Sequence, residues 1–237
     1  MECISRDFPA TKDEKMKLEK MDDFFAARVS GYDEHMRTTI EGAEAFYAYT
    51  ASLLPSAGDA EDVHVLDLGC GTGLELEQYF KLAPEAHVTG IDLSHAMLNA
   101  LKQKFPDKKL SLIIGSYFEV PFGEDMFDAA VSVESLHHFT AEKKEGLYRR
   151  LHAALKNGGY FVLTDYFSES DELEKEYFLN LKKLKAEQGL SDDEFYHYDT
   201  PLTVEHEKEA LIAAGFSDVQ VMREWGTTVT LRAVKHS

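Results

Sequence analysis

The spacing of hydrophobic positions changes along the chain and divides its first 165 residues into two zones. Residues 13–54 have helical spacing, with apolar side chains three and four positions apart. Between residues 63 and 165, short apolar runs alternate with stretches of helical spacing. These runs are continuous and rich in β-branched and aromatic residues, which is typical of strands buried on both faces of a parallel sheet. The pattern predicts strands at residues 63–68, 87–91, 110–114, 127–133 and 160–164, and helices at residues 74–82, 94–105 and 140–156.

The remaining part begins with an acidic stretch of helical spacing and ends with two β-type runs. An aromatic loop containing Tyr196, His197 and Tyr198 lies between them, and it could either wall a substrate site or pack beneath a cap. Too few residues separate the two final runs for a crossover helix, so we expect them to pair antiparallel. Helices are predicted at residues 168–189 and 203–214, and the last strands at residues 218–223 and 227–234.

Strand–helix alternation of this kind predicts an α/β fold, in which a doubly wound sheet has helices on both faces. Five parallel strands and the antiparallel C-terminal hairpin give a seven-stranded, Rossmann-like sheet. We expect a single structural unit with four segments. These are an N-terminal helical cap at residues 1–55, the core at 56–166, a helical lid insertion at 167–202, and the completion of the core at 203–237.

The formal charge of −18, from 25 basic and 43 acidic residues, narrows the expected partners. Nucleic-acid binding depends mainly on Lys and Arg displacing counterions from phosphates, and anionic membranes would repel the chain for the same reason. Residues 165–199 alone hold eleven acidic residues against four lysines. We therefore expect a neutral or cationic small molecule as the partner, and neither nucleic acid nor a membrane.

The two cysteines, Cys3 and Cys70, provide neither a disulfide framework nor the spacing of a zinc site. Reduced thiols in a cytoplasmic protein are the simpler interpretation. The first fifteen residues lack the charged-then-apolar pattern of a signal peptide. No uncharged apolar run approaches the roughly 20 residues that span a bilayer. These features predict a soluble cytoplasmic protein, and they do not indicate its oligomeric state.

The most informative segment is a glycine-rich turn that follows the first predicted strand. It contains Gly69, Gly71 and Gly73, and the helix at residues 74–82 begins directly after it. Glycines allow the backbone to approach a ligand closely, and the start of a helix offers unpaired N–H groups to an anionic group. Asp92 ends the second predicted strand, 19 positions past Gly73. A carboxylate at that place can accept hydrogen bonds from both hydroxyls of a ribose.

Such a turn could belong to a dinucleotide-binding oxidoreductase, and the spacing of its glycines distinguishes the alternatives. The dinucleotide pattern G-x-G-x-x-G would need a glycine at the position of Leu74. In this turn the glycines instead occupy alternate positions, Gly69, Gly71 and Gly73. An acidic residue, Asp67, lies two positions before the first of them. This pattern resembles motif I of the class I S-adenosylmethionine-dependent methyltransferases.

The resemblance continues along the chain, from about residue 23 to residue 234, through motifs that occur in the family's order. It is closest to small-molecule methyltransferases of the ubiquinone/menaquinone type. The matching segments are residues 24–28 with 32–33, residues 90–94 with 97–98, residues 121–122 with 127–128 and 131–132, residues 155–160, and residues 214–216.

The resemblance implies S-adenosylmethionine as the cofactor and S-adenosylhomocysteine as the product. By position, Asp92 would bind the ribose, with Leu93 and Met97 against the adenine. Where the family commonly has an acidic residue for the adenine amino group, this chain has Ser116 and Tyr117, which is a departure. The residues implied for the methionine portion are Asp67, the backbone of Gly69, Cys70 and Gly71, Glu134, and Arg28 and Tyr32 over its carboxylate.

Two adjacent histidines, His137 and His138, follow the fourth predicted strand, at the edge where doubly wound sheets bind ligands. Either could act as a general base, and Tyr166 after the fifth strand could orient an acceptor. A structural role for the histidine pair is equally open. We expect no metal, because adjacent ligands diverge and no nearby Cys or carboxylate spacing completes a zinc set.

Methyl transfer from a sulfonium is an in-line displacement in which positioning and desolvation can supply most of the rate. The sequence therefore predicts an S-adenosylmethionine-dependent methyltransferase acting on a small molecule. Two alternatives are a non-catalytic S-adenosylmethionine-binding regulator or scaffold and, with less support, an NAD-dependent oxidoreductase. The acceptor and its reacting atom are not indicated, since acceptor specificity resides in variable loops.

Overall fold

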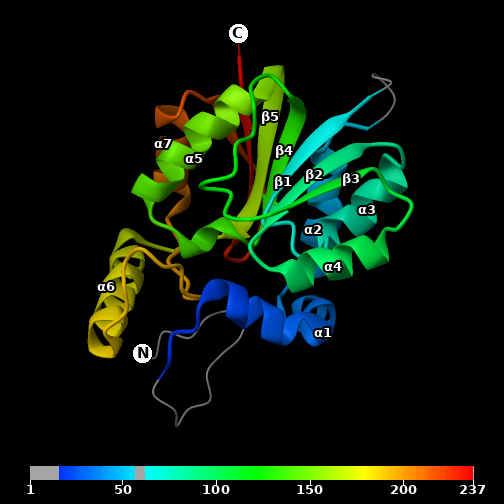
Figure 1. The fold of residues 1–237 in the computed structure, drawn as a ribbon. Coiled ribbons are helices and arrows are strands. Elements are labelled where there is room, and N and C mark those ends of the chain that lie inside the picture. Colours follow the sequence, from blue (N-terminus) through cyan, green and yellow to red (C-terminus); the bar gives the residue numbers. More distant parts are fainter. Residues whose placement is uncertain (1–15, 57–61, 237) are drawn as a thin grey trace.

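The computed structural model describes residues 16–56 and 62–236. Seven strands form one sheet in the order β3-β2-β1-β4-β5-β7-β6, as Figure 1 shows. The first five are parallel, and β7 pairs antiparallel with both β5 and β6, which confirms the predicted fold class. The strands are β1 (His64–Leu68), β2 (His87–Asp92), β3 (Leu110–Ile114), β4 (Phe127–Val133), β5 (Leu155–Tyr166), β6 (Ser217–Trp225) and β7 (Thr228–Val234).

Helices cover both faces of this sheet (Figure 1). On one face, α2 packs against α3 with α4 beside them, and on the other face α5 packs against α7. Helix α1 crosses the carboxyl edge of the sheet, and α6 lies beyond that edge. The helices are α1 (Met21–Thr39), α2 (Ala43–Leu53), α3 (Leu74–Leu82), α4 (His95–Lys104), the short 3-10 helix η1 (Leu136–His138), α5 (Ala141–Ala154), α6 (Asp171–Gln188) and α7 (Val204–Ala213).

Side-chain caps explain where four of these helices begin. In α4, α5, α6 and α7, the residue before the first turn accepts a hydrogen bond from a backbone N–H within that turn. Such a cap satisfies one of the four N–H groups that the start of a helix leaves without an internal partner. The capping residues are Ser94, Thr140, Ser170 and Thr203.

The apolar core has one layer on each face of the sheet. Phe46 and Ala51 of α2 are fully buried with Val65 of β1 and Tyr79 of α3. Helix α2 is therefore part of a core layer, and α1 is the N-terminal helix that covers the carboxyl edge. None of the helices in residues 16–56 and 62–236 is both long and apolar enough to cross a membrane.

Strand β5 begins earlier than the sequence predicts. The sequence predicts a helix at residues 140–156 and a strand at 160–164, but α5 ends at Ala154 and the chain enters β5 directly at Leu155. Leu155 pairs with Phe127 of β4, and a shift of register separates this pair from the rest of the ladder. The longer strand brings Asp165, near its carboxyl end, beside the residues that follow β4.

Candidate functional site

The glycine turn after β1 forms the floor of the site. Gly69 has a φ of +74°, and a Cβ at this position would lie 2.1 Å from the hydroxyl oxygen of Ser135. Gly71 also has a positive φ, and its N–H donates to Oδ2 of Asp92 at 2.9 Å. Only glycine permits both the left-handed backbone and this close approach to the end of β4.

Asp92 stands at the carboxyl end of β2, in the position that the sequence predicts. Its second oxygen, Oδ1, accepts a hydrogen bond from the N–H of Ser94 at 2.7 Å. Burial raises the pKa of Asp92, while the hydrogen bonds from Ser94 and Gly71 act in the opposite direction. Each carboxylate oxygen keeps a lone pair beyond its backbone bond, so the group remains able to accept from two further hydroxyls.

A cavity of about 50 Å³ lies above the glycine turn and is bounded on its far side by α1. Drug-sized ligands occupy pockets of about 300–1,000 Å³, so a nucleoside-sized ligand requires the covering side chains of α1 to move. These covering side chains are Met21, Phe25 and Tyr32. The remaining lining residues are Gly69, Gly71, Asp92, Leu93, Met97, Tyr117, Glu134, Ser135 and His138.

Polar contacts fasten the C-terminal half of α1 to the core. Asp33 accepts a hydrogen bond from the hydroxyl of Thr72 at 2.5 Å and pairs with Lys104 of α4 at 2.6 Å. The covering side chains Met21 and Phe25 lie nearer the N-terminal end of the helix, away from this attachment. The N-terminal end of α1 is held separately, because the N–H of Met21 donates to the carbonyl oxygen of Phe195 at 3.1 Å.

Behind the glycine turn, Asp67 of β1 lies beside Glu75 of α3, and both carboxyl groups are buried. Burial and the neighbouring charge of Glu75 raise the pKa of Asp67 well above its usual range, and burial also raises the pKa of Glu75. Oδ2 of Asp67 has no hydrogen-bond partner among the described residues. A carboxyl group in this state favours a proton or a cationic ligand group at the back of the turn.

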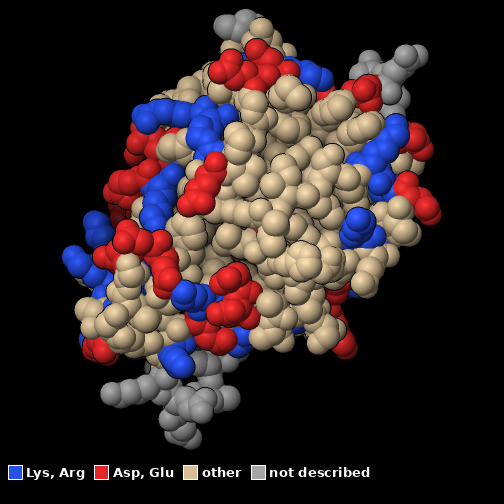
Figure 2. All heavy atoms as spheres, viewed as in Figure 1, with Lys and Arg blue, Asp and Glu red and all other residues tan. Residues whose placement is uncertain are grey.

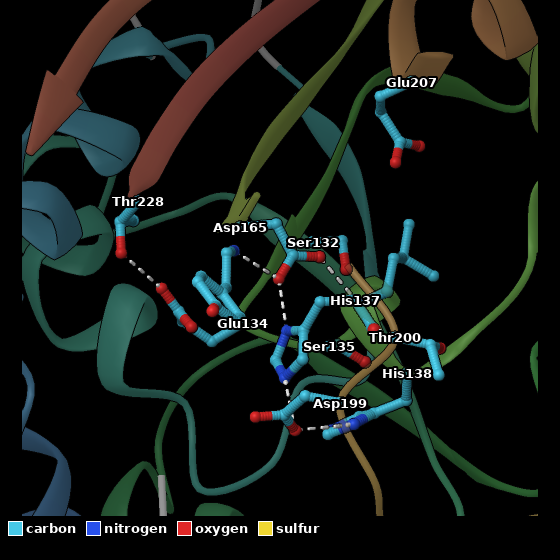
Figure 3. Close-up of polar contacts among 12 residues, drawn as sticks. Ser132, Glu134, Ser135, His137, His138, Asp165, Asp199, Thr200, Glu207 and Thr228 are labelled. Carbon is cyan, nitrogen blue, oxygen red and sulfur yellow. Dashed lines mark hydrogen bonds and ion pairs between the residues drawn. The ribbon is translucent and has the colours of Figure 1, made fainter. Parts of the chain in front are cut away.

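Four buried residues form a chain of polar contacts where β4 and β5 end (Figure 3). Nδ1 of His137 is 2.5 Å from Asp165, and its Nε2 is 3.6 Å from Asp199. Nδ1 of His138 is 3.4 Å from the same oxygen of Asp199. Asp165 also accepts from the N–H of Leu136, which holds the start of η1.

Histidine charge keeps both carboxylates of this chain ionised. Although burial acts to raise it, the charge and hydrogen bond of His137 lower the pKa of Asp165. Burial likewise opposes ionisation of Asp199, but the hydrogen bond from His138 and the charges of the nearby histidines outweigh it and lower the pKa. Two carboxylates of lowered pKa therefore lie on either side of the His137 ring in the interior.

His138 contacts the cavity above the glycine turn and also a second cavity of about 370 Å³. Its Nδ1 is 3.2 Å from the carbonyl oxygen of Tyr198, which can only accept, so in the neutral ring Nδ1 carries the proton and Nε2 the lone pair. Nε2 is buried and has no hydrogen-bond partner among the described residues. This nitrogen is an available proton acceptor between two cavities.

The structure brings together most of the residues predicted for the cofactor. Tyr32, Gly69, Gly71, Asp92, Leu93, Met97, Tyr117, Glu134 and the base candidate His138 all line the first cavity.

Other predicted residues do not line it, each for a local reason. Arg28 pairs with Glu19 at 2.8 Å and stacks on Phe24. The hydroxyl of Ser116 accepts from the N–H of Phe118. Cys70 and Asp67 are buried behind the turn, His137 lies behind His138 in the polar chain, and the hydroxyl of Tyr166 is 2.9 Å from that of Tyr177 on α6.

Sequence reasoning missed Met21, Phe25, Ser135 and Asp199. Ser135 could have been found, because it follows Glu134 directly at the end of β4. Nothing in the sequence indicated Asp199, which reaches the histidine pair from a loop about 60 positions later. The expectation of no metal rested on the absence of a nearby carboxylate, and Asp199 supplies one through the fold. Its contacts with both histidines are accounted for by the polar chain described above.

The residues around the first cavity fit S-adenosylmethionine. The glycine turn has no side chain to obstruct the approach of a ligand to its backbone, and Asp92 offers two oxygens to the hydroxyls of a ribose. Leu93 and Met97 supply apolar contacts beside Asp92 for a flat base. Carboxylates at the cavity and behind the turn suit the ammonium and sulfonium charges of this cofactor.

Comparison with known proteins agrees with this fit. The model of a family described as a methyltransferase domain matches residues 65–159. Carboxy-S-adenosyl-L-methionine synthase of Campylobacter fetus is 25% identical over 234 residues, 93% of this chain and 97% of that protein. A sterol 24-C-methyltransferase of Gibberella zeae is 28% identical over 195 residues, 78% of this chain. The matched part covers 46% of that sterol enzyme, so the chain corresponds to about half of its length.

Among solved structures, human N-acetylserotonin methyltransferase in complex with S-adenosylmethionine superposes with a TM-score of 0.62 at 20% identity. The match covers 91% of this chain and 57% of the human protein, and at this identity it shows a shared fold. Fold and site define a Rossmann-like protein that binds S-adenosylmethionine. The family model over residues 65–159 and the relatives named above support a class I S-adenosylmethionine-dependent methyltransferase, and S-adenosylmethionine is the cofactor of this class.

Proposed function

We propose that this protein transfers a methyl group from S-adenosylmethionine to a small-molecule acceptor, with His138 as the general base. The observation that carries the proposal is the position of His138, whose available Nε2 lies between the cofactor cavity and a second cavity of about 370 Å³. When bound, S-adenosylmethionine supplies an electrophilic methyl group on a positively charged sulfur. The protein's part is to position the acceptor, exclude water and remove a proton where the acceptor has one to lose.

The polar chain behind His138 supports this role. The carbonyl of Tyr198 holds the proton on Nδ1, so Nε2 is the nitrogen that accepts the acceptor's proton. Asp199 then faces the imidazolium that forms, at 3.4 Å from Nδ1. His137 and Asp165 act behind Asp199 as positioning residues, because His137 contacts both carboxylates.

The second cavity supports a small molecule as the acceptor. Its volume is at the lower end of the range for pockets that hold drug-sized ligands, about 300–1,000 Å³. The chain's charge of −18 disfavours the phosphate backbone of RNA or DNA. Closure of α1 over the cofactor provides the exclusion of water that the transfer needs.

A turnover assay tests the proposal. The protein is incubated with S-adenosylmethionine and either small phenols, amines, thiols and carboxylic acids or total tRNA, and S-adenosylhomocysteine release is measured. We expect release with a small acceptor that ionises, and a loss of about 100-fold or more in His138→Gln, because general bases contribute about 10²–10⁴. His206→Gln, at a half-buried histidine on α7, is the control and should retain activity.

The same assay discriminates the alternatives. Cofactor binding without turnover of any acceptor would favour a regulator or scaffold. Methylation of tRNA alone would contradict a small-molecule acceptor. Turnover unchanged in His138→Gln would remove this residue from the mechanism.

A further inference from the structure

The second cavity lies between α6, the start of α5 and the loop at residues 192–200. His138 lines both this cavity and the cofactor cavity, and Thr200 lines this cavity alone. Apolar and aromatic side chains form much of its wall, from Phe139, Phe178, Leu181, Phe195 and Tyr196. A molecule held here would present a hydrophobic or aromatic body to the wall and one end to Nε2 of His138.

Three lysines also line this cavity: Lys143 of α5, and Lys182 and Lys185 of α6. Among the described residues, neither Lys143 nor Lys182 forms an ion pair with a carboxylate. The ammonium of Lys143 instead lies 4.6 Å from the centre of the Phe195 ring. Three cations on one cavity are unexpected in a chain with a net charge of −18.

The two acidic residues on the cavity do not balance these lysines. Asp192 lies 3.4 Å from Lys185, and its side chain is 94% exposed, so solvent screens its charge. Glu194 pairs with Lys20 at 2.6 Å and also accepts from the hydroxyl of Tyr196. Lys143 and Lys182 therefore leave positive charge facing the cavity.

The position of Lys143 makes a purely structural role a poor explanation. Lysines in the last turns of α6 complement the negative end of that helix, but Lys143 lies in the first turn of α5, where a cation opposes the helix dipole. Partial desolvation and the nearby charge of Lys185 lower the pKa of Lys143, and they outweigh the opposing charges of Asp192 and Asp193. An anion bound in the cavity would relieve both unfavourable contacts.

The distribution of charge along α6 explains how a basic cavity exists in an acidic segment. The first half of the helix carries four acidic residues and one lysine, whereas the second half carries Lys182, Lys183 and Lys185 with one acidic residue, Glu187. Figure 2 shows side chains of both signs on this side of the molecule, without a continuous acidic surface. At physiological salt, charges more than about 8 Å apart are largely screened, so the local lysines outweigh the distant acids.

We propose that the second cavity binds an acceptor with a hydrophobic or aromatic body and a carboxylate or similar anionic group. Lys143, Lys182 and Lys185 hold the anionic group, and His138 faces the group that receives the methyl. The inference rests on the proposed function, and it replaces the neutral or cationic acceptor that the overall charge predicts.

Calorimetry with matched acid–amide pairs tests this specificity. The protein is first saturated with S-adenosylhomocysteine. It is then titrated with 4-hydroxybenzoate, 4-hydroxyphenylacetate and indole-3-acetate, and separately with the corresponding neutral amides. We expect at least one acid to bind about tenfold more tightly than its amide, and the preference to decrease as salt is added.

Lysine variants show whether the preference arises in this cavity. The double variant Lys143→Gln/Lys182→Gln should lose most of the preference for acids over amides. Its affinity for S-adenosylhomocysteine should be unchanged. Lys183→Gln is the matched control, because Lys183 is adjacent to Lys182 on α6 but is 73% exposed and does not line the cavity. This control should bind the acids as the wild type does.

Amides that bind as tightly as the acids, acids that bind the double variant unchanged, or no binding by any acid would each overturn the inference. In all three outcomes S-adenosylhomocysteine still binds. Failure of S-adenosylhomocysteine itself to bind would instead contradict the proposed function.

Discussion

The hydroxyl of Ser135, after β4, occupies the space into which a side chain on Gly69 would project. A Cβ on Gly69 would lie 2.1 Å from Oγ of Ser135 and 2.7 Å from its Cβ. The glycine turn and the end of β4 are thus in contact, and together they form the floor of the cofactor cavity.

This contact predicts the effect of Gly69→Ala. The variant combines backbone strain at a φ of +74° with a steric clash, so it should destabilise the fold by about 1–3 kcal/mol and abolish S-adenosylhomocysteine binding. Urea unfolding and calorimetry measure the two effects.

Gly158→Ala is the control for backbone strain. Gly158 has a φ of +79°, but a Cβ there would meet nothing within 4 Å. The variant should therefore show the strain alone and keep cofactor affinity. Adding Ser135→Gly to Gly69→Ala removes the clash. The stability and cofactor affinity of this double variant should therefore approach those of Gly158→Ala. If Gly69→Ala and Gly158→Ala lost equal amounts of unfolding free energy and cofactor affinity, the contact with Ser135 would be unimportant.

Burial of His197 predicts a loss of stability in mild acid. Burial, followed by the nearby charge of His138, lowers the pKa of His197 well below its usual value of about 6.5. The unfolded chain takes up this proton below about pH 6.5 and the native state does not. The free energy of unfolding should therefore decrease by up to about 1.4 kcal/mol per pH unit from this group as pH falls from 6.5 toward 5.

His197→Phe isolates that contribution. The ring of His197 stacks on Phe24 at 3.6 Å between centroids, and phenylalanine can keep this stacking without titrating. The stability of the variant should vary less with pH between 5 and 7. The lowered pKa of Asp199 does not interfere, because its contribution is lost only below about pH 3.8. Identical slopes for variant and wild type would contradict this account of His197.

Removing one partner of the buried ion pair between α5 and α7 should destabilise the fold strongly. Nζ of Lys144 lies 2.5 Å from Glu207, and both side chains are almost fully buried. Lys144→Met should cost about 3–5 kcal/mol of unfolding free energy, because it leaves Glu207 charged and buried without its cation. Lys144→Met/Glu207→Leu should cost less than the single variant, since no charge is left uncompensated.

Lys156→Met provides a partly exposed comparison for that pair. Lys156 pairs with Asp128 at 2.8 Å, but 40% of its side chain is exposed. Its loss should cost about 0–1 kcal/mol, as for other solvent-accessible pairs. Similar losses for the two lysines in urea unfolding would show that burial does not distinguish them.

The carboxylate of Asp92 should determine cofactor affinity. Asp92→Ala removes both oxygens available to the ribose hydroxyls, and hydrogen bonds to charged groups contribute about 1.5–3 kcal/mol each. Calorimetry should show S-adenosylhomocysteine affinity reduced by about 100-fold or more. Asp107→Asn, at an exposed turn after α4, should bind normally. An affinity for Asp92→Ala within a few-fold of the wild type would contradict the predicted role of Asp92.

The sequence was sufficient for the fold because its strongest signals are local. Continuous apolar runs predicted β3 and β4 with their observed bounds, and the short connection between β6 and β7 required antiparallel pairing. The glycine turn and Asp92 were equally readable, since both lie at strand ends, where backbone geometry fixes their positions.

The second half of the site could not be predicted, because it depends on contacts between distant segments. Asp199 reaches the histidine pair through the packing of a loop, which no local pattern indicates. The family resemblance implies Arg28 as a cofactor ligand, but in the structure Arg28 pairs with the carboxylate of Glu19, nearby in the chain. The lysines that line the second cavity could not be predicted from the net charge. The net charge is a sum over the whole chain and does not show which residues the fold brings together.

Thermal unfolding with three ligands tests the central claim most directly. The melting temperature is measured alone and with S-adenosylmethionine, S-adenosylhomocysteine or NAD, each at about 100 times its Kd where binding occurs. Binding to the native state alone then adds about 2.7 kcal/mol, which raises Tm by about 5–10 °C in a domain of this size. We predict this rise with both sulfur ligands and none with NAD. A rise with NAD and none with the sulfur ligands would contradict the assignment of the site.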